Sequence, residues 1–159
     1  MNKVSKIMLS CGLVFSTAVG AAAIDSHQSQ TQAAETPYYN YTGYTSANSE
    51  FILDQDFINA IKYKNLTING YKITNSDAET AEMVDIYDQS FRKTGENKAD
   101  AVTFDLDGKT VSKNDLLTVY GPSDVTDTPA GNMYERNYNG TSIKFYVNDG
   151  YVTKVQINT

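Results

Sequence analysis

The pattern of apolar positions divides the chain into an apolar start and a longer mixed part. Residues 7–19 are mostly apolar, two lysines precede them, and small residues follow them. A basic start, a short apolar run and a small-residue end are typical of a secretory signal peptide. We predict that residues 1–34 are removed by cleavage after Ala34; cleavage after Ala23 is the alternative.

A membrane anchor is the alternative interpretation of the apolar run. Residues 7–19 fall short of the roughly 20 apolar residues that a spanning helix needs, and they include Ser10, Ser16 and Thr17. Cys11 precedes most of the run, whereas a lipid-modified cysteine should follow it. We therefore expect a secreted protein that adheres to the cell surface, if at all, noncovalently and without a membrane span.

The mixed part contains two short helix patterns, each with a start signal. Asp54 is predicted to cap the first helix, whose apolar stripe lies within residues 57–61. Ser112 and Asp115 are spaced as in a capping box at the start of the second helix. Gly121 is predicted to end that helix.

Asn-Gly and Asp-Gly pairs mark tight turns between β-prone runs. Asn69-Gly70 is predicted to join two short strands, and Asn139-Gly140 and Asp149-Gly150 to separate the last three, which begin at Met133. Alternation in the last two strands predicts one apolar face. Its residues are Ile143, Phe145, Val147, Val155 and Ile157.

The middle of the chain is harder to interpret. Residues 83–91 fit a helical stripe or one face of a strand, and we favour one continuous strand. The polar stretch 94–100 predicts a loop. Residues 101–106 predict a strand that an Asp107-Gly108 turn joins to residues 109–111. A calcium loop is the alternative at this turn, but further oxygen ligands and a closing glutamate are missing.

Together these elements predict an α+β domain, in which two short helices pack on one face of an antiparallel, hairpin-rich β-sheet. We expect a single domain over residues 51–159. Residues 35–50 are rich in tyrosine and poor in aliphatic residues, which predicts a tyrosine-rich N-terminal arm, extended or paired as an edge strand.

Removal of residues 1–34 changes the available chemistry. The chain has one cysteine and one histidine, Cys11 and His27, and both lie in the predicted signal peptide. The mature chain then lacks a thiolate nucleophile, an imidazole base and a zinc site of nitrogen or sulfur ligands. We therefore expect a protein that is not an enzyme and needs no cofactor or metal. A hydrolase with two carboxylates within about 10 Å is the remaining enzymatic alternative.

The charge of the mature chain is negative. Cleavage removes two of the 13 basic and one of the 19 acidic residues, which leaves 11 and 18 and a net charge of about −7. An acidic chain gains little from the counterion release that drives nonspecific binding to nucleic acid. Such binding would need a local basic patch.

Several motifs resemble the immunodominant staphylococcal antigen B family. They are Thr36-Pro37-Tyr38-Tyr39, residues 51–54, residues 57–63 and Asn69-Gly70. The resemblance implies an exported, immunogenic protein that binds extracellular nucleic acid without sequence preference. It assigns no binding residues, and the negative mature charge departs from the family's basic members.

Two binding hypotheses follow for a protein that we expect to be a monomer. Extracellular DNA or RNA would be bound by arm tyrosines that stack on bases and by outward side chains of the last hairpin. The candidates are Tyr38, Tyr39, Tyr41, Tyr44, Lys144, Tyr146 and Lys154. Alternatively, a host or competitor protein would bind a tyrosine-rich surface. A contiguous aromatic patch without lysines would favour a protein, and a groove lined with lysine or arginine would favour a polyanion.

Overall fold

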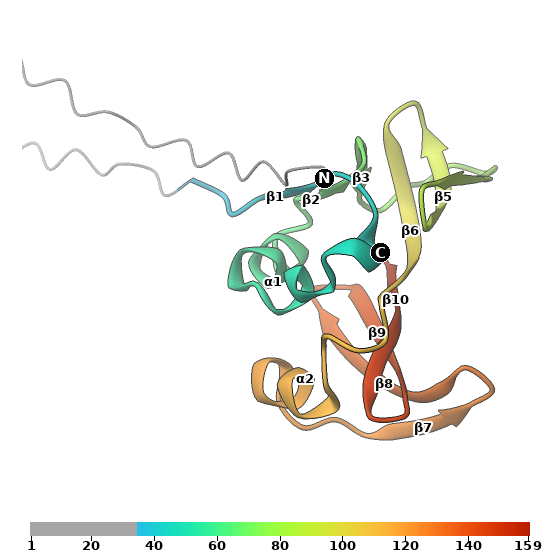
Figure 1. The fold of residues 1–159 in the computed structure, drawn as a ribbon. Coiled ribbons are helices and arrows are strands. Elements are labelled where there is room, and N and C mark those ends of the chain that lie inside the picture. Colours follow the sequence, from blue (N-terminus) through green and yellow to red (C-terminus); the bar gives the residue numbers. More distant parts are fainter. Residues whose placement is uncertain (1–34) are drawn as a thin grey trace, which may run out of the picture. The chain divides into compact units, whose positions relative to one another are not determined.

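Ten strands of the described part of the chain join into one sheet, and two α-helices pack against it (Figure 1). This computed structural model describes residues 35–159, so the predicted signal peptide lies outside the described residues. Residues Thr36–Thr159 form one unit, which includes the tyrosine-rich segment.

The helical elements are η1 Thr45–Ala47, η2 Ser49–Leu53, α1 Gln55–Lys62 and α2 Lys113–Tyr120. The strands are β1 Tyr39–Tyr41, β2 Leu66–Ile68, β3 Tyr71–Ile73, β4 Glu82–Ile86, β5 Gln89–Gly95, β6 Lys98–Asp105, β7 Val125–Thr128, β8 Gly131–Tyr138, β9 Thr141–Asn148 and β10 Tyr151–Asn158.

The α+β class is confirmed, but the sheet is mixed rather than antiparallel. Its main order is β1-β2-β3-β6-β10-β9-β8-β7, and the β4–β5 hairpin pairs with β6 through β5. β1 runs parallel to β2, and β3 runs parallel to β6. The expectation of a purely antiparallel sheet was wrong because hairpin turns report only the direction of neighbouring strands. They do not report how strands distant in sequence pair.

The helical elements η2 and α2 pack on the same face of the sheet. Phe104, Val155 and Phe145 are cross-strand neighbours on β6, β10 and β9, so their side chains share a face. The ring of Phe51 from η2 lies 5.7 Å from that of Phe104, and the ring of Tyr120 from α2 lies 4.6 Å from that of Phe145. The predicted apolar face of the last two strands is buried as expected.

The helix start signals are confirmed in position. Ser112 accepts a hydrogen bond from the Asp115 N–H and the Asp115 carboxylate accepts one from the Ser112 N–H, which is a complete capping box. Asp54 occupies the N-cap of α1, but its carboxylate accepts from the Tyr39 hydroxyl, at 3.3 Å, rather than from the first turn.

Two expectations for the middle of the chain were wrong. Residues 83–91 form two strands, β4 and β5, because Tyr87 adopts a positive φ of 56° and turns the chain with Asp88. Tyrosine is uncommon in this conformation, so the sequence carried no turn signal there. The expected loop at 94–100 is instead a tight hairpin, in which β5 ends at Gly95 and β6 begins at Lys98.

The expectation of a hairpin turn at Asp107-Gly108 was also wrong. The Asp107 carboxylate accepts hydrogen bonds from the N–H groups of Lys109 and Thr110, at 2.8 and 2.9 Å, and this turn leads the chain into α2. The short strand β7 was not predicted. Asn69-Gly70 and Asn139-Gly140 are confirmed as tight turns with positive φ at both residues.

A polar network centred on Asp88 fixes the segment between β1 and α1. The Asp88 carboxylate accepts from the N–H groups of Thr45, at 2.9 Å, and Ser46, at 2.8 Å. The fully buried Thr45 hydroxyl lies 3.0 Å from this carboxylate and 2.8 Å from the carbonyl oxygen of Asp105. The buried Gln89 amide also donates to Asp88 and, at 3.0 Å, to the Gly43 carbonyl oxygen.

Replacement of Asp88 by alanine should lower the free energy of unfolding by about 2 kcal/mol, because it leaves several donors without a charged acceptor. Burial alone raises the pKa of Asp88, but hydrogen bonds from Ser46 and Thr45 outweigh it and hold this pKa below its usual value. The contribution should therefore be present above about pH 4 and be lost as the pH falls further toward the folded pKa.

Urea unfolding followed by circular dichroism tests this effect. Asp77→Ala, at an exposed loop position, is the control. Equal stability of the two variants at neutral pH would refute the role of Asp88.

Candidate functional site

The four arm tyrosines do not form one stacking surface. Tyr38 and Tyr44 are 54% and 52% exposed, but Tyr41 is only 2% exposed. The Tyr41 hydroxyl donates to the Tyr44 carbonyl oxygen at 2.7 Å, and burial, with a smaller effect of Asp88, raises the pKa of Tyr41 to about 12. The predicted stacking role of Tyr41 is therefore wrong, since its ring is part of the core.

Tyr39 also belongs to the fold. Its ring stands edge-on to Phe57, with centroids 5.7 Å apart, and its hydroxyl donates to Asp54. Burial, together with Asp54, raises the pKa of Tyr39. The sequence could not reveal this because the partners of Tyr39 lie in η2 and α1, beyond the segment itself.

The last hairpin carries its three candidate residues on the outer face of the sheet, as predicted. Tyr146 and Lys154 are cross-strand neighbours, and Lys144 stands beside Gln156 on the same hairpin. The positive charges here are faced by carboxylates. Lys154 lies 3.8 Å from Asp105, and Lys144 is the cross-strand neighbour of Glu135.

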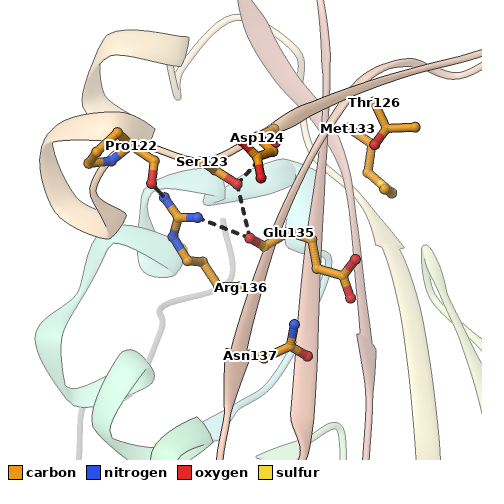
Figure 2. Close-up of a pocket in the computed structure, with 8 residues that line it drawn as sticks. All are labelled: Pro122, Ser123, Asp124, Thr126, Met133, Glu135, Arg136 and Asn137. Atoms are coloured by element: carbon orange, nitrogen blue, oxygen red, sulfur yellow. Dashed lines mark hydrogen bonds between the residues drawn. The ribbon is translucent and has the colours of Figure 1, made fainter.

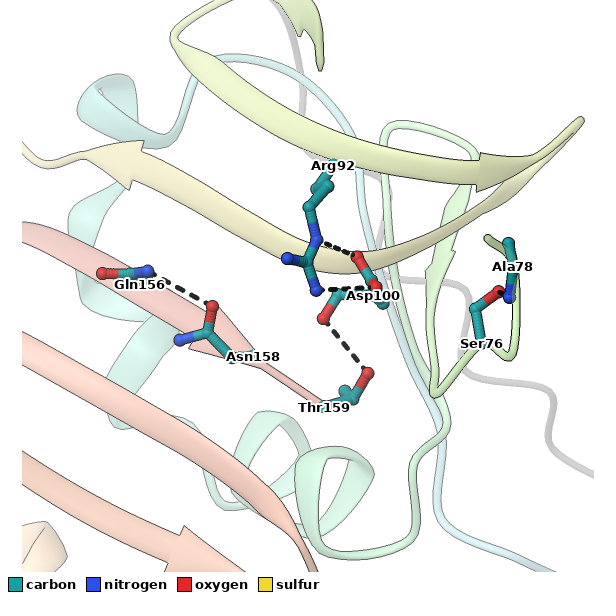
Figure 3. Close-up of polar contacts among 7 residues, drawn as sticks. All are labelled: Ser76, Ala78, Arg92, Asp100, Gln156, Asn158 and Thr159. Carbon is teal, nitrogen blue, oxygen red and sulfur yellow. Dashed lines mark hydrogen bonds and ion pairs between the residues drawn. The ribbon is translucent and has the colours of Figure 1, made fainter. Parts of the chain in front are cut away.

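Strands β5 and β6 likewise pair a positive charge with a carboxylate. Arg92 donates two hydrogen bonds of 2.7 Å to the Asp100 carboxylate, and the Asp100 carbonyl oxygen accepts from the Thr159 hydroxyl (Figure 3). The amide of Gln156 donates to Asn158 on the same face. A polyanion would have to displace existing carboxylate partners here, so this face is a poor site for phosphates.

An open concavity of about 570 Å³ lies between the end of α2 and strands β7 and β8 (Figure 2). Its lining is mostly polar and includes Ser123, Asp124, Glu135 and Arg136. Glu135 accepts a hydrogen bond from Ser142 at 2.5 Å, and its carboxylate points away from Asp124 in Figure 2. The two acids thus do not converge as a two-carboxylate hydrolase requires.

The cation in this concavity is already engaged. The Arg136 guanidinium donates to the carbonyl oxygens of Tyr120 (2.9 Å), Gly121, Pro122 and Glu135 (3.0 Å). The first three oxygens belong to the end of α2 and the residues after it, where a positive charge is favourable. Arg136 therefore holds α2 against β8 and is not available to a ligand.

A corner that the sequence analysis missed combines aromatic and basic side chains. We call Lys62, Tyr63, Lys64 and Tyr138 the Lys62–Lys64 corner. Tyr63 follows the last residue of α1 and is 60% exposed. The Lys62 ammonium lies 5.3 Å from the centre of the Tyr138 ring, and the Lys64 ammonium donates to Asn75 at 2.7 Å.

The lysines of this corner differ from Lys154 on the outer face, which lies 3.8 Å from Asp105. Within residues 35–159, no carboxylate lies within 4.0 Å of the Lys62 or Lys64 ammonium. The negative end of the helix dipole explains a lysine at the end of α1, but it does not explain an exposed tyrosine between two lysines. The signal that could have found the site is the Lys-Tyr-Lys triplet directly after the amphipathic stripe.

No helix in residues 35–159 has the length and apolar character needed to cross a membrane. In the same residues, no three side chains from histidine, cysteine, aspartate or glutamate are grouped so that they could hold a metal ion.

The fold and its surface define an α+β domain with a polar outer sheet face and one basic, aromatic corner. The chain belongs to the Immunodominant staphylococcal antigen B family, whose sequence profile matches residues 38–157. It is 34% identical to the Immunodominant staphylococcal antigen B of Staphylococcus aureus strains USA300 and NCTC 8325, over 99% of this chain and 95% of each relative. The resemblance inferred from the motifs is thereby confirmed.

A solved structure of YjgB, a DUF4309 family protein from Bacillus subtilis, is only distantly similar. The superposition covers 57% of this chain and 72% of the YjgB chain, with 13% sequence identity and a TM-score of 0.38. Likeness at this level carries no argument about function.

Replacement of Arg136 by lysine should lower the free energy of unfolding by about 1–3 kcal/mol, because an ammonium cannot reach the same set of carbonyl oxygens. Arg92→Lys is the matched control, and its exposed pair with Asp100 should cost at most about 1 kcal/mol. Urea unfolding measures both. If the Arg136 variant is no less stable than the control, Arg136 does not hold α2.

Proposed function

We propose that the mature protein is an exported, noncatalytic antigen that binds single-stranded nucleic acid without sequence preference, and that it does so through the Lys62–Lys64 corner. The observation that carries this proposal is the exposed ring of Tyr63 between two lysines that have no carboxylate partner in the described residues. The noncatalytic role is supported by the sequence, since the one histidine and the one cysteine both lie within residues 1–34.

The chemistry of the corner suits a single strand. A base that stacks on an exposed tyrosine gains about 1–3 kcal/mol, and any base can do so because each has a flat π-face. The two lysines that flank Tyr63 in the sequence supply positive charges that can neutralise phosphates. Tyr138 is half-buried beneath Lys62, so it orients that lysine rather than the base.

The size of the corner limits its affinity. Two neutralised phosphates give a salt slope of about −1.4 on logarithmic axes, so the association constant should fall about sevenfold between 50 and 200 mM salt. The net charge of about −7 left after cleavage opposes binding further. We therefore expect weak binding that is measurable mainly at low salt.

Fluorescence anisotropy with a labelled oligothymidine tests the site. Tyr63→Ala should weaken binding about 5- to 150-fold, which is the loss of one stacked base. The double variant Lys62→Gln/Lys64→Gln should weaken binding and abolish most of the salt dependence. The control Lys144→Gln/Lys154→Gln removes the same charge from the outer face and should bind as the wild type does.

Two results would count against the proposal. Absence of wild-type binding at low salt would remove the function itself. Loss of binding in the control pair alone would move the site to the last hairpin.

One observation favours a second function, the binding of a protein partner. Tyr44 and Tyr87 are 52% and 55% exposed, and their rings contact each other edge to face with centroids 4.7 Å apart. The Asp88 network holds the backbone beneath both rings. A rigid pair of exposed tyrosines is suited to a protein interface because it buries much area with few rotors to freeze.

A pull-down from host serum tests this alternative. The wild type and the Tyr63→Ala variant should both retain a specific serum partner. The Tyr44→Ser/Tyr87→Ser variant should not retain it, because this variant removes both rings. Tyr38→Ser, at another exposed arm tyrosine, is the control. Identical serum proteins on the wild type and the double variant would reject the interface.

A further inference from the structure

The chain contains two Asn-Gly turns with nearly the same backbone geometry. The φ angles are 45° and 86° at Asn69 and Gly70, and 50° and 85° at Asn139 and Gly140. The Asn-Gly pair and its φ angles are thus matched at the two turns. Any difference in the chemistry of the two asparagines must come from their surroundings.

The Asn69 side chain is held at both ends of its amide. Its Oδ1 accepts from the Gly43 N–H at 2.7 Å, and its Nδ2 donates to the Gly43 carbonyl oxygen at 3.1 Å and to Gln89. Its own N–H donates to the Tyr41 carbonyl oxygen at 2.8 Å. This turn is therefore fastened to β1, to the loop after it and to β5.

The Asn139 side chain is much less constrained. Asn139 and Gly140 are exposed at the tip of the β8–β9 hairpin, where local opening is easier than in the core. Its Nδ2 donates to the Lys62 carbonyl oxygen at 3.0 Å, and its Oδ1 accepts no hydrogen bond from a described residue. A Cβ on Gly140 would lie 3.7 Å from the Lys64 ammonium, so a cation stands directly beside this turn.

We propose that Asn139 is a self-modifying site that deamidates in the folded protein, while Asn69 is protected. The Gly140 amide nitrogen loses its proton and attacks Cγ of Asn139. The bond from Cγ to the side-chain nitrogen breaks, ammonia leaves, and a five-membered succinimide forms. Water then opens this ring to aspartate or isoaspartate, so the net reaction consumes one water and releases one ammonia.

The surroundings favour this reaction at Asn139 alone. The Lys64 cation stabilises the deprotonated Gly140 nitrogen and, later, the new carboxylate. At Asn69 the hydrogen bonds to Gly43 and Gln89 must break before the ring can close. At about 0.5–1.5 kcal/mol each, their loss slows the reaction at Asn69 by at least about tenfold.

The modification also regulates the Lys62–Lys64 corner, a consequence that rests on the proposed function. It places a negative charge beside the turn that the Lys64 ammonium borders, and Lys64 has no carboxylate partner in the described residues. The corner then neutralises fewer phosphates. Nucleic-acid affinity falls as the protein ages.

Peptide mass spectrometry after incubation of the purified protein at mildly alkaline pH and body temperature tests the modification. The peptide that contains Asn139 should gain one mass unit and isoaspartate, and the peptide that contains Asn69 should not. Protein unfolded in urea is the control, since both peptides should then convert. Equal rates at both sites in the folded protein, or conversion at neither, would overturn the proposal.

Anisotropy of the same labelled oligothymidine with Asn139→Asp tests the consequence separately. The variant should bind more weakly than the wild type. The slope of the logarithm of its association constant against the logarithm of the salt concentration should be shallower by about 0.7. Unchanged affinity would refute the regulatory role. If the wild type does not bind at all, the proposed function fails, but the mass-spectrometric result on Asn139 still decides the modification.

Discussion

The Asp88 carboxylate is the constraint on which the arrangement of this domain depends. It lies at the β4–β5 turn and accepts hydrogen bonds from backbone groups of Thr45 and Ser46, more than forty residues earlier. Because Thr45 and Gln89 are buried beneath it, this charge cannot be removed without leaving polar groups unpaired. The carboxylate thereby fixes the tyrosine-rich segment to the sheet and sets which of its rings remain exposed.

The distribution of charge follows from the same fold. Cross-strand register places Lys144 beside Glu135 and Lys154 beside Asp105, so the outer face of the sheet neutralises itself. The end of α1 lies outside this register and keeps lysines without such partners in the described residues. An acidic protein can in this way retain one small site for polyanions, whose strength is limited by its two charges and one exposed ring.

Local signals predicted the parts of the fold that depend on local chemistry. The capping box at Ser112, the Asn69-Gly70 turn and the alternation in the last hairpin need only residues a few positions apart. The parallel pairing of β1, the burial of Tyr41 and the role of Arg136 depend on partners distant in sequence, so no local pattern reveals them. The Lys62–Lys64 corner falls between these cases: its Lys-Tyr-Lys triplet is a local signal that was overlooked, whereas Tyr138 joins the corner only in the folded chain.

Native-state hydrogen exchange at the Thr45 and Ser46 amides is the most direct test of this account. If the Asp88 carboxylate fixes the segment, both amides should exchange only through global unfolding, with the same protection free energy as amides in the centre of β6. Exchange near the rates of an open, solvated chain would contradict it. The tyrosine-rich segment would then be a free arm, and its rings would all be available to a ligand.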